Sequence, residues 1–164
     1  MTTYQYQSPI GKLYLEVENL VFTRLILPTQ TPLRTTLNNH MTLPQEYAAD
    51  LDTYFQGLPI VFHWPTQLFG TNFQQQVWQQ LASIKYGETS TYKIIAESCN
   101  TKGYQAVGRA ISANPLPIII PCHRVLGTHS FGGYNGGITV KSMLLALEGA
   151  LPGSGLGQMP DGFA

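Results

Sequence analysis

The stretch IIIPCHRVLG, Ile118–Gly127, places three isoleucines before Pro121 and then sets Cys122 directly beside His123. An apolar run of this kind is typical of a buried strand or strand-like segment, and the proline stops regular strand pairing. The cysteine therefore stands where an inner element ends, a frequent position for chemistry. A thiol beside a base fits a nucleophile, and it equally fits a buried small hydrophobic side chain with a basic neighbour.

Upstream of this stretch, two short helical patterns, residues 89–100 and 104–114, are separated by the turn NTKG, which ends at Gly103. The second helix is expected to bury Tyr104, Val107 and Ile111. Its outward side carries mostly small residues and one arginine: Gln105, Ala106, Arg109 and Ala113. A helix, a Gly-containing turn and a helix with a small outer face are typical of a helix-turn-helix, although many αα-hairpins share this pattern.

Downstream, the last predicted helix, about Ile138 to Glu148, has an apolar stripe that ends in a carboxylate. The stripe consists of Val140, Met143, Leu144 and Leu147, and Glu148 continues it on the same face. A carboxylate in this position needs a partner to offset the cost of desolvation. The following Gly149 leaves the alternative that the side chain turns out to solvent.

A pairing of Glu148 with His123 would make a relay. The carboxylate accepts from one imidazole nitrogen and fixes the tautomer, and the other nitrogen can take the proton of Cys122, directly or through a water. Nucleophile, base and orienting acid then follow the logic of a catalytic triad. Because the thiolate is the reactive form, such a relay makes a buried cysteine nucleophilic near neutral pH. Cys99, on an apolar helix face, is expected to be an inert core thiol.

The first third of the chain predicts a separate lobe. Residues 8–27 alternate apolar and polar side chains, which indicates two strands joined by a turn near Glu18 and Asn19, and Tyr4–Gln7 adds a third strand. Residues 44–57 have helical spacing, with Pro44 at the first helical position and Gly57 as the stop.

The predicted fold class is α/β (α+β), with a small antiparallel-sheet N-terminal lobe at 1–65 and a mostly helical C-terminal lobe with a helix-turn-helix at 66–150. The remaining residues, 151–164, are rich in Gly and Pro and are predicted to be a disordered tail.

Composition limits the class of protein. With 164 residues, 43% hydrophobic and 11% charged, the chain can form one compact unit or two small lobes. No segment approaches the roughly 20 apolar residues of a membrane helix, and the N-terminus lacks a signal-peptide core. Two cysteines make no disulfide framework, so a cytoplasmic location is expected, and cysteines and histidines match no zinc spacing.

The net charge of zero argues against a simple polybasic nucleic-acid binder, but the charges are unevenly distributed. Residues 1–65 hold three Lys/Arg against five Asp/Glu, whereas residues 85–141 hold six against two. Those six are Lys85, Lys93, Lys102, Arg109, Arg124 and Lys141. A locally basic second half suits a phosphate-facing surface, and a chance fluctuation among few charges is the alternative.

The ordered set IPCHRV, preceded by AVGRAISANPLPII and followed by GGYNGG and VKSMLLALEG, resembles the active-site signature of the O6-alkylguanine-DNA alkyltransferases. The resemblance is close over about Phe69–Gly149 and loose over SPIGKLYLEV. It implies a suicidal methyltransferase that flips an alkylated guanine out of duplex DNA and transfers the alkyl group irreversibly to Cys122, without metal or organic cofactor. Relatives that merely bind damage carry Trp instead of this Cys.

The resemblance also implies residue roles. His123 acts through a water as base to Cys122, Glu148 holds His123, and Asn114 braces the turn before the active-site segment. Tyr92 donates to the guanine as negative charge develops on it. Three further residues surround the base: Val125, whose carbonyl with that of Cys122 accepts from the exocyclic amine, Tyr134, which lines the alkyl pocket, and Asn135, whose main-chain N–H points at O6.

In the family, an arginine early in the recognition helix fills the gap left by the flipped base, and here that position is Gln105. The DNA-contacting set by resemblance is Gln105, Ala106, Arg109 and Ala113, approaching double-stranded DNA through the minor groove as a monomer. Glutamine lacks the stacking and charge of the guanidinium, so weaker DNA binding or slower flipping is expected.

Three functions from different classes remain open from the residues: a DNA repair alkyltransferase, a damage sensor with an idle thiol, and a cysteine hydrolase using Cys122, His123 and Glu148. A hydrolase also needs an oxyanion hole, for which the sequence holds no dedicated motif.

Overall fold

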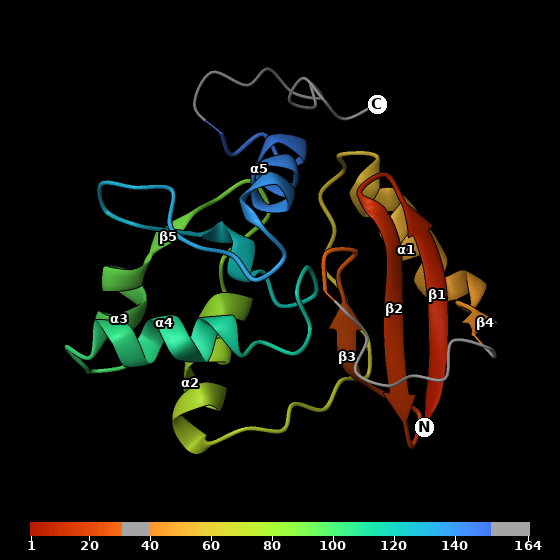
Figure 1. Ribbon diagram of the computed structural model, residues 1–164, viewed down its shortest axis with the longest axis horizontal. Coiled ribbons are helices and arrows are strands. Elements are labelled where there is room, and N and C mark those ends of the chain that lie inside the picture. The colour runs from red at the N-terminus through yellow and green to blue at the C-terminus, as the bar shows by residue number, and fades with distance from the viewer. Residues whose placement is uncertain (31–39, 152–164) are drawn as a thin grey trace.

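Three antiparallel strands open the chain: β1 (Thr2–Ser8), β2 (Gly11–Glu18) and β3 (Val21–Ile26). They belong to a computed structural model that describes residues 1–30 and 40–151 (Figure 1). Asn19 and Leu20 join β2 to β3 with positive φ angles of 50° and 67°, the conformation that a two-residue hairpin turn requires. The three predicted strands are therefore confirmed.

The sheet has the order β3-β2-β1-β4, and β4 (Met41–Thr42) pairs parallel to β1. The predicted antiparallel sheet is confirmed for β1, β2 and β3, and β4 adds a short parallel strand at its edge. Strand β4 has two residues, which pair with Tyr4 and Gln5 of β1. Two residues are too few to show the alternation that predicts a strand.

Helix α1 (Gln45–Phe55) packs against the sheet and buries Leu51, Tyr54 and Phe55. Pro44 is the residue before the first helical turn, one position earlier than predicted. Gly57 follows the helix with a φ of 77°, which suits a glycine at a helix end.

The second lobe is helical, with α2 (Asn72–Ala82), α3 (Tyr92–Ser98), α4 (Tyr104–Ser112) and α5 (Ile138–Leu147). Helix α2 starts with a capping box between Thr71 and Gln74, and its Val77, Trp78 and Leu81 are buried. Helices α3 and α4 pack against each other as the predicted helix pair. Together with the sheet lobe they confirm the fold class.

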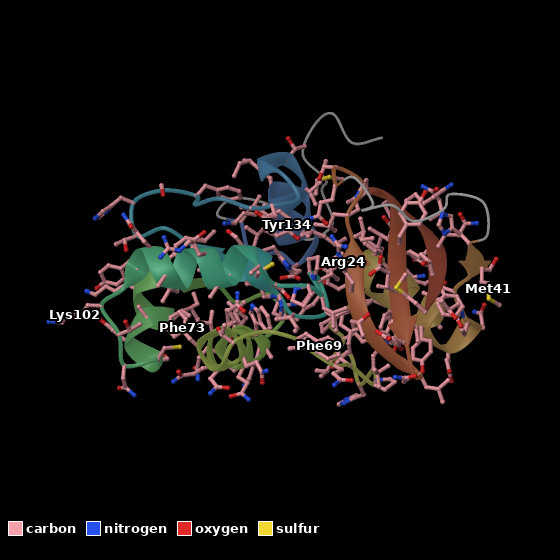
Figure 2. All side chains as sticks on the ribbon, turned by 60° about the horizontal axis from the view of Figure 1, so that its bottom comes forward. Arg24, Met41, Phe69, Phe73, Lys102 and Tyr134 are labelled. Carbon is pink, nitrogen blue, oxygen red and sulfur yellow. The ribbon has the colours of Figure 1, made fainter. Side chains whose placement is uncertain are left out.

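Tyr104 is 48% exposed, so its predicted inward position is wrong, whereas Val107 and Ile111 are buried as expected. The reason is its place as the first residue of α4, next to the α3–α4 turn. That turn, which contains the exposed Lys102, lies at the outer edge of the helical lobe (Figure 2).

The segment before Cys122 is buried but is not a strand, which corrects the prediction. Ile118 has a φ of 73°, and Pro117 and Ile120 form only an isolated bridge. The side chain of Asn114 holds this segment in place of strand pairing. Its Nδ2 donates to the carbonyl of Ile120 at 2.8 Å, and its Oδ1 accepts from the N–H of Leu116 at 3.0 Å.

After this turn, Cys122–Arg124 form one turn of 3₁₀ helix, η1. The chain then enters β6 (Val125–Leu126), which pairs in parallel with β5 (Ser90–Thr91). This two-stranded pairing was not predicted, because each strand has only two residues. It places the start of α3 beside the residues that follow Cys122.

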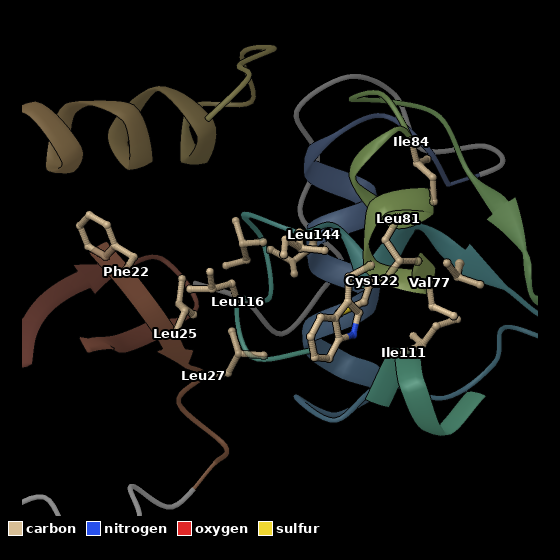
Figure 3. Packing of buried hydrophobic residues seen from close by; sticks show 14 of the residues in the cluster. Phe22, Leu25, Leu27, Val77, Leu81, Ile84, Ile111, Leu116, Cys122 and Leu144 are labelled. Atoms are coloured by element: carbon tan, nitrogen blue, oxygen red, sulfur yellow. The ribbon is translucent and has the colours of Figure 1, made fainter. Parts of the chain in front are cut away.

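The two lobes share a core. Leu116 lies between β3 and the helical lobe, close to Leu25 and Leu27 (Figure 3). The N–H of Leu25 donates to the carbonyl of Pro115 at 2.8 Å, and Thr29 Oγ1 donates to the carbonyl of Gly136 at 2.8 Å. The sheet lobe therefore holds both the segment before Cys122 and the glycine-rich loop after it.

Of the predicted tail, only Leu151 lies within the described residues. The division of the chain at residue 65 stays a prediction. Among the helices of residues 1–30 and 40–151, none has the length and apolar character needed to cross a bilayer.

Candidate active site

Glu148 stands at the C-terminal end of α5 and points inward, with 3% of its surface exposed. Its Oε1 lies 2.7 Å from Nε2 of His123. Arg124 donates to both carboxylate oxygens, from Nε at 2.9 Å and Nη2 at 3.0 Å, and from Nη1 to the carbonyl of Ile84 at 2.6 Å. The hydroxyl of Tyr54 donates to Oε1 at 2.7 Å. The alternative of a solvent-facing Glu148 is therefore wrong.

These donors determine the charge of the carboxylate. Burial alone would raise the pKa of Glu148, but His123 and Arg124 together lower it to about 2. Glu148 is therefore ionised near neutral pH and can only accept, so Nε2 of His123 carries a proton. In the neutral ring, Nδ1 then holds a free lone pair. This buried nitrogen has no hydrogen-bond partner within residues 1–30 and 40–151.

The Cys122 thiol is buried, and burial raises its pKa to about 11. The side-chain amide of Asn114, the main-chain groups of Cys122 and His123, and the charge of Lys141 oppose this effect without cancelling it. The thiol is thus protonated near neutral pH. Reaction at this sulfur requires a base, and His123 is the adjacent residue in the chain.

Cys122 lies in the wall of a pocket that both lobes line. Five of the predicted site residues belong to its lining: Tyr92, Asn114, Cys122, Tyr134 and Asn135. The other lining residues are Leu27, Gln30, Ile111, Ser112, Pro117, Gly133 and Gly136. Leu27 and Gln30 come from the sheet lobe, which the sequence had not connected with the site.

Val125 is not part of this lining. It is fully buried, and its carbonyl accepts from Nζ of Lys141 at 2.7 Å. The carbonyl of Cys122 accepts from the N–H of Val125.

Lys141, in α5, ties the glycine-rich loop to the active-site segment. Besides Val125, Nζ donates to the carbonyls of Phe131 at 2.8 Å and Gly133 at 3.0 Å. Burial lowers the pKa of Lys141 to about 8, and Cys122 acts in the opposite direction. Neither Lys141 nor Arg124 is a surface charge, with 0% and 6% exposed, so their inclusion in a phosphate-facing surface was wrong.

The loop GGYNGG, Gly132–Gly137, approaches both lobes closely. At Gly132, where φ is 77°, an added Cβ would stand 3.0 Å from the ring of Tyr92. At Gly136 it would clash with Leu27 at 2.4 Å. Tyr134 lies on this loop between the helical lobe and the sheet (Figure 2), and the amide of Asn135 donates to the carbonyl of Ser112. The loop is thereby fixed against both lobes.

The outward face of α4 forms a shallow depression beside the pocket. Gln105, Arg109 and Ala113 line it and are exposed; Ala106 is half-buried and lies outside the lining. Tyr104, Gly108, Tyr92 and Ser112 complete the lining. Since Tyr92 and Ser112 also line the Cys122 pocket, the two hollows adjoin.

Three buried polar residues at the site were missed by sequence reasoning: Tyr54, Arg124 and Lys141. Tyr54 follows Leu51 at helical spacing and therefore has the pattern of a core residue. Lys141 did carry a signal, because a charge beside Val140 interrupts an otherwise apolar helix. In the described part of the chain, no group of His, Cys, Asp and Glu is placed to hold a metal ion.

Comparisons with known proteins show which proteins this chain resembles. Residues 72–150 match the family model described as 6-O-methylguanine DNA methyltransferase, DNA binding domain. The methylated-DNA–protein-cysteine methyltransferase of Mycobacterium leprae is 44% identical over 145 residues, which are 86% of this chain and 88% of that protein. The protein of the same name from Sulfolobus acidocaldarius is 45% identical over 98 residues, 60% of this chain and 63% of that protein.

Solved structures give the same result. The crystal structure of Mycobacterium tuberculosis OGT in complex with DNA has a TM-score of 0.80 and 37% identity, covering 92% of this chain and 94% of that chain. Similarity of this extent in both sequence and structure shows that the chain belongs to the methylated-DNA–protein-cysteine methyltransferase family.

Proposed function

We propose that this protein repairs O6-alkylguanine in DNA by direct reversal, with Sγ of Cys122 as the acceptor of the alkyl group. The observation that carries this proposal is the buried Cys122 thiol in a pocket wall, followed in the chain by a histidine that a buried carboxylate holds at 2.7 Å. The names of the relatives support the same reaction.

The proton of Cys122 passes to Nδ1 of His123, directly or through one water, and Glu148 stabilises the resulting imidazolium. The thiolate then attacks the alkyl carbon, so that the S–C bond forms as the C–O6 bond breaks. The guanine leaves with the electron pair. Its N1 finally carries the hydrogen that the thiol lost, which balances the reaction.

Tyr92 donates a hydrogen bond to the guanine as negative charge develops. Burial raises the pKa of this tyrosine, so its hydroxyl remains protonated and available as a donor. The product at Cys122 is a thioether. It has no electrophilic carbonyl for water to attack, so each protein molecule acts once.

Helix α4 contacts the DNA in the minor groove. The flipped guanine passes from the depression on α4 into the Cys122 pocket. The common lining by Tyr92 and Ser112 supports this path. Gln105 fills the gap in the base stack, while Ala106 and Ala113 permit close approach and Arg109 contacts phosphate. We further propose that the protein acts as a monomer in the cytoplasm, where its two free cysteines stay reduced.

Stoichiometry tests the proposal. A duplex with one O6-methylguanine is incubated with increasing amounts of protein, and the remaining modified base is quantified after digestion of the DNA. Loss of one O6-methylguanine per protein molecule, retained by Cys99→Ser and abolished by Cys122→Ser, is the expected result. Binding of the duplex without loss of the methyl group would indicate a sensor, and repeated turnover of an ester would indicate a hydrolase.

A further inference from the structure

Tyr54 brings a side chain of the N-terminal lobe into the relay. It lies in α1, is 0% exposed, and is 94 residues from Glu148 in sequence. Its hydroxyl donates to Oε1 of Glu148 at 2.7 Å and lies 3.5 Å from Nε2 of His123. The same carboxylate oxygen therefore contacts the histidine, the arginine of η1 and a hydroxyl from another lobe.

Packing contacts account for an aromatic ring at position 54, but they do not require the hydroxyl group of Tyr54. The ring contacts Phe55, Phe62 and Tyr86 at centroid distances of 5.2, 5.9 and 6.0 Å. A phenylalanine would make the same aromatic contacts. Burial and the nearby Glu148 carboxylate raise the pKa of Tyr54, so the hydroxyl stays a donor.

Arg124 alone does not direct the carboxylate towards His123. Its guanidinium donates to both oxygens, and Oε2 accepts only from Arg124 among the described hydrogen bonds, whereas Oε1 accepts from three side chains. The hydroxyl of Tyr54 is a further donor to Oε1 and limits rotation of the carboxylate away from Nε2 of His123. A fixed Oε1 keeps the proton on Nε2 and the lone pair on Nδ1.

We propose that Tyr54 is a positioning residue for the alkyl transfer, acting through Glu148 on His123. The inference rests on the proposed function and extends it, because it gives the N-terminal lobe a part in the chemistry. Tyr54 does not touch the base or the sulfur in this account. Its removal should change the rate of the chemical step and leave DNA binding unaltered.

The test is single-turnover methyl transfer from a duplex containing O6-methylguanine, measured over a range of DNA concentrations. For Tyr54→Phe we expect the saturating rate constant to fall about tenfold, as one lost hydrogen bond to a charged group would produce. The half-saturating DNA concentration should not change. Tyr6→Phe is the matched control, because Tyr6 donates to the Asp52 carboxylate at 2.6 Å in the same lobe, away from Cys122.

Two further measurements separate positioning from a general loss of structure. Both variants are compared at a temperature well below their melting temperatures, where only Tyr54→Phe should lose rate. In a His123→Gln background, Tyr54→Phe should have little effect, because the base through which it acts is gone. A full tenfold loss in that background, or equal rate losses in the two single variants, would overturn the proposal.

The outcomes also distinguish the inference from the proposed function. If the unmodified protein transfers the methyl group and Tyr54→Phe is equally fast, the positioning role is wrong and the repair function stands. If the unmodified protein transfers no methyl group, the repair function itself is wrong, and the role of Tyr54 in it is wrong as well.

Discussion

Nε2 of His123 and Oε1 of Glu148 lie 2.7 Å apart in a site where both side chains are fully shielded from solvent. The histidine belongs to the 3₁₀ turn after Pro121, and the glutamate ends α5. Two elements of different type thus supply a base and its orienting carboxylate. Arg124 neutralises the carboxylate from the other side, with its Nε 2.9 Å from Oε2. A buried arrangement of this kind is costly to disturb.

Replacing Glu148 by glutamine should affect both stability and rate. The change leaves Arg124 buried without its counter-ion, so the free energy of unfolding should fall by about 3 kcal/mol. Methyl transfer at saturating DNA should slow by about 100-fold, within the range for impaired general-base catalysis. Urea unfolding and single-turnover kinetics measure the two effects, with the exposed Glu88→Gln as the control. A variant of unchanged rate would remove Glu148 from the relay.

The same residue predicts a dependence of stability on pH. The pKa of Glu148 is lowered from its ordinary value of 4.5 to about 2 in the folded protein. A depressed carboxyl pKa contributes stability that is present above pH 4.5 and is lost as the pH falls towards 2. The contribution is roughly 3 kcal/mol. Denaturant unfolding of the protein and of Glu148→Gln between pH 5 and pH 2 should converge; parallel curves would contradict this.

The reactivity of Cys122 towards a small alkylating agent should rise steeply with pH. Because burial raises the thiol pKa to about 11, the thiolate is scarce at pH 7. In a Cys99→Ser background without DNA, the rate of reaction with iodoacetamide should increase about tenfold per pH unit between pH 8 and pH 10. The rate is followed by intact mass. A plateau that begins near pH 7 would show that the free protein already holds a thiolate.

Gln105→Arg tests the consequence of the glutamine on the exposed face of α4. A guanidinium at this position adds charge and a planar group that stacks on bases. We expect faster repair at subsaturating DNA. An unchanged rate constant at saturation would indicate tighter DNA binding, and a higher one would indicate faster flipping. Gln79→Arg, on the exposed side of α2, adds the same charge elsewhere and should not accelerate repair. No gain for Gln105→Arg at low DNA concentration would contradict the assignment.

Sequence periodicity predicted the long elements well, because their side chains repeat over several turns or pleats. The hairpin of β2 and β3, helix α1 and the α3–α4 pair all follow this rule. The prediction of a strand before Cys122 was wrong, because the side chain of Asn114 holds this segment instead of strand pairing. An apolar composition indicates that a segment is buried, but it does not determine the backbone conformation of that segment.

The candidate site was predictable to the extent that its residues adjoin in sequence or continue a pattern. Cys122 and His123 adjoin, and the position of Glu148 at the end of an apolar stripe indicated a buried partner. Tyr54 and Lys141 could not be placed at the site, since only the packing of α1 and α5 brings them there. Long-range contacts between lobes leave little local signal in a single sequence.

The most direct test of the central claim is intact-protein mass spectrometry after incubation with a duplex containing one O6-methylguanine, followed by peptide mapping. We expect one added methyl group on Cys122, saturating at one per protein molecule, and none on Cys122→Ser. Measurable binding of the modified duplex with no added mass would contradict it, and would leave a damage-binding protein with an unreactive thiol.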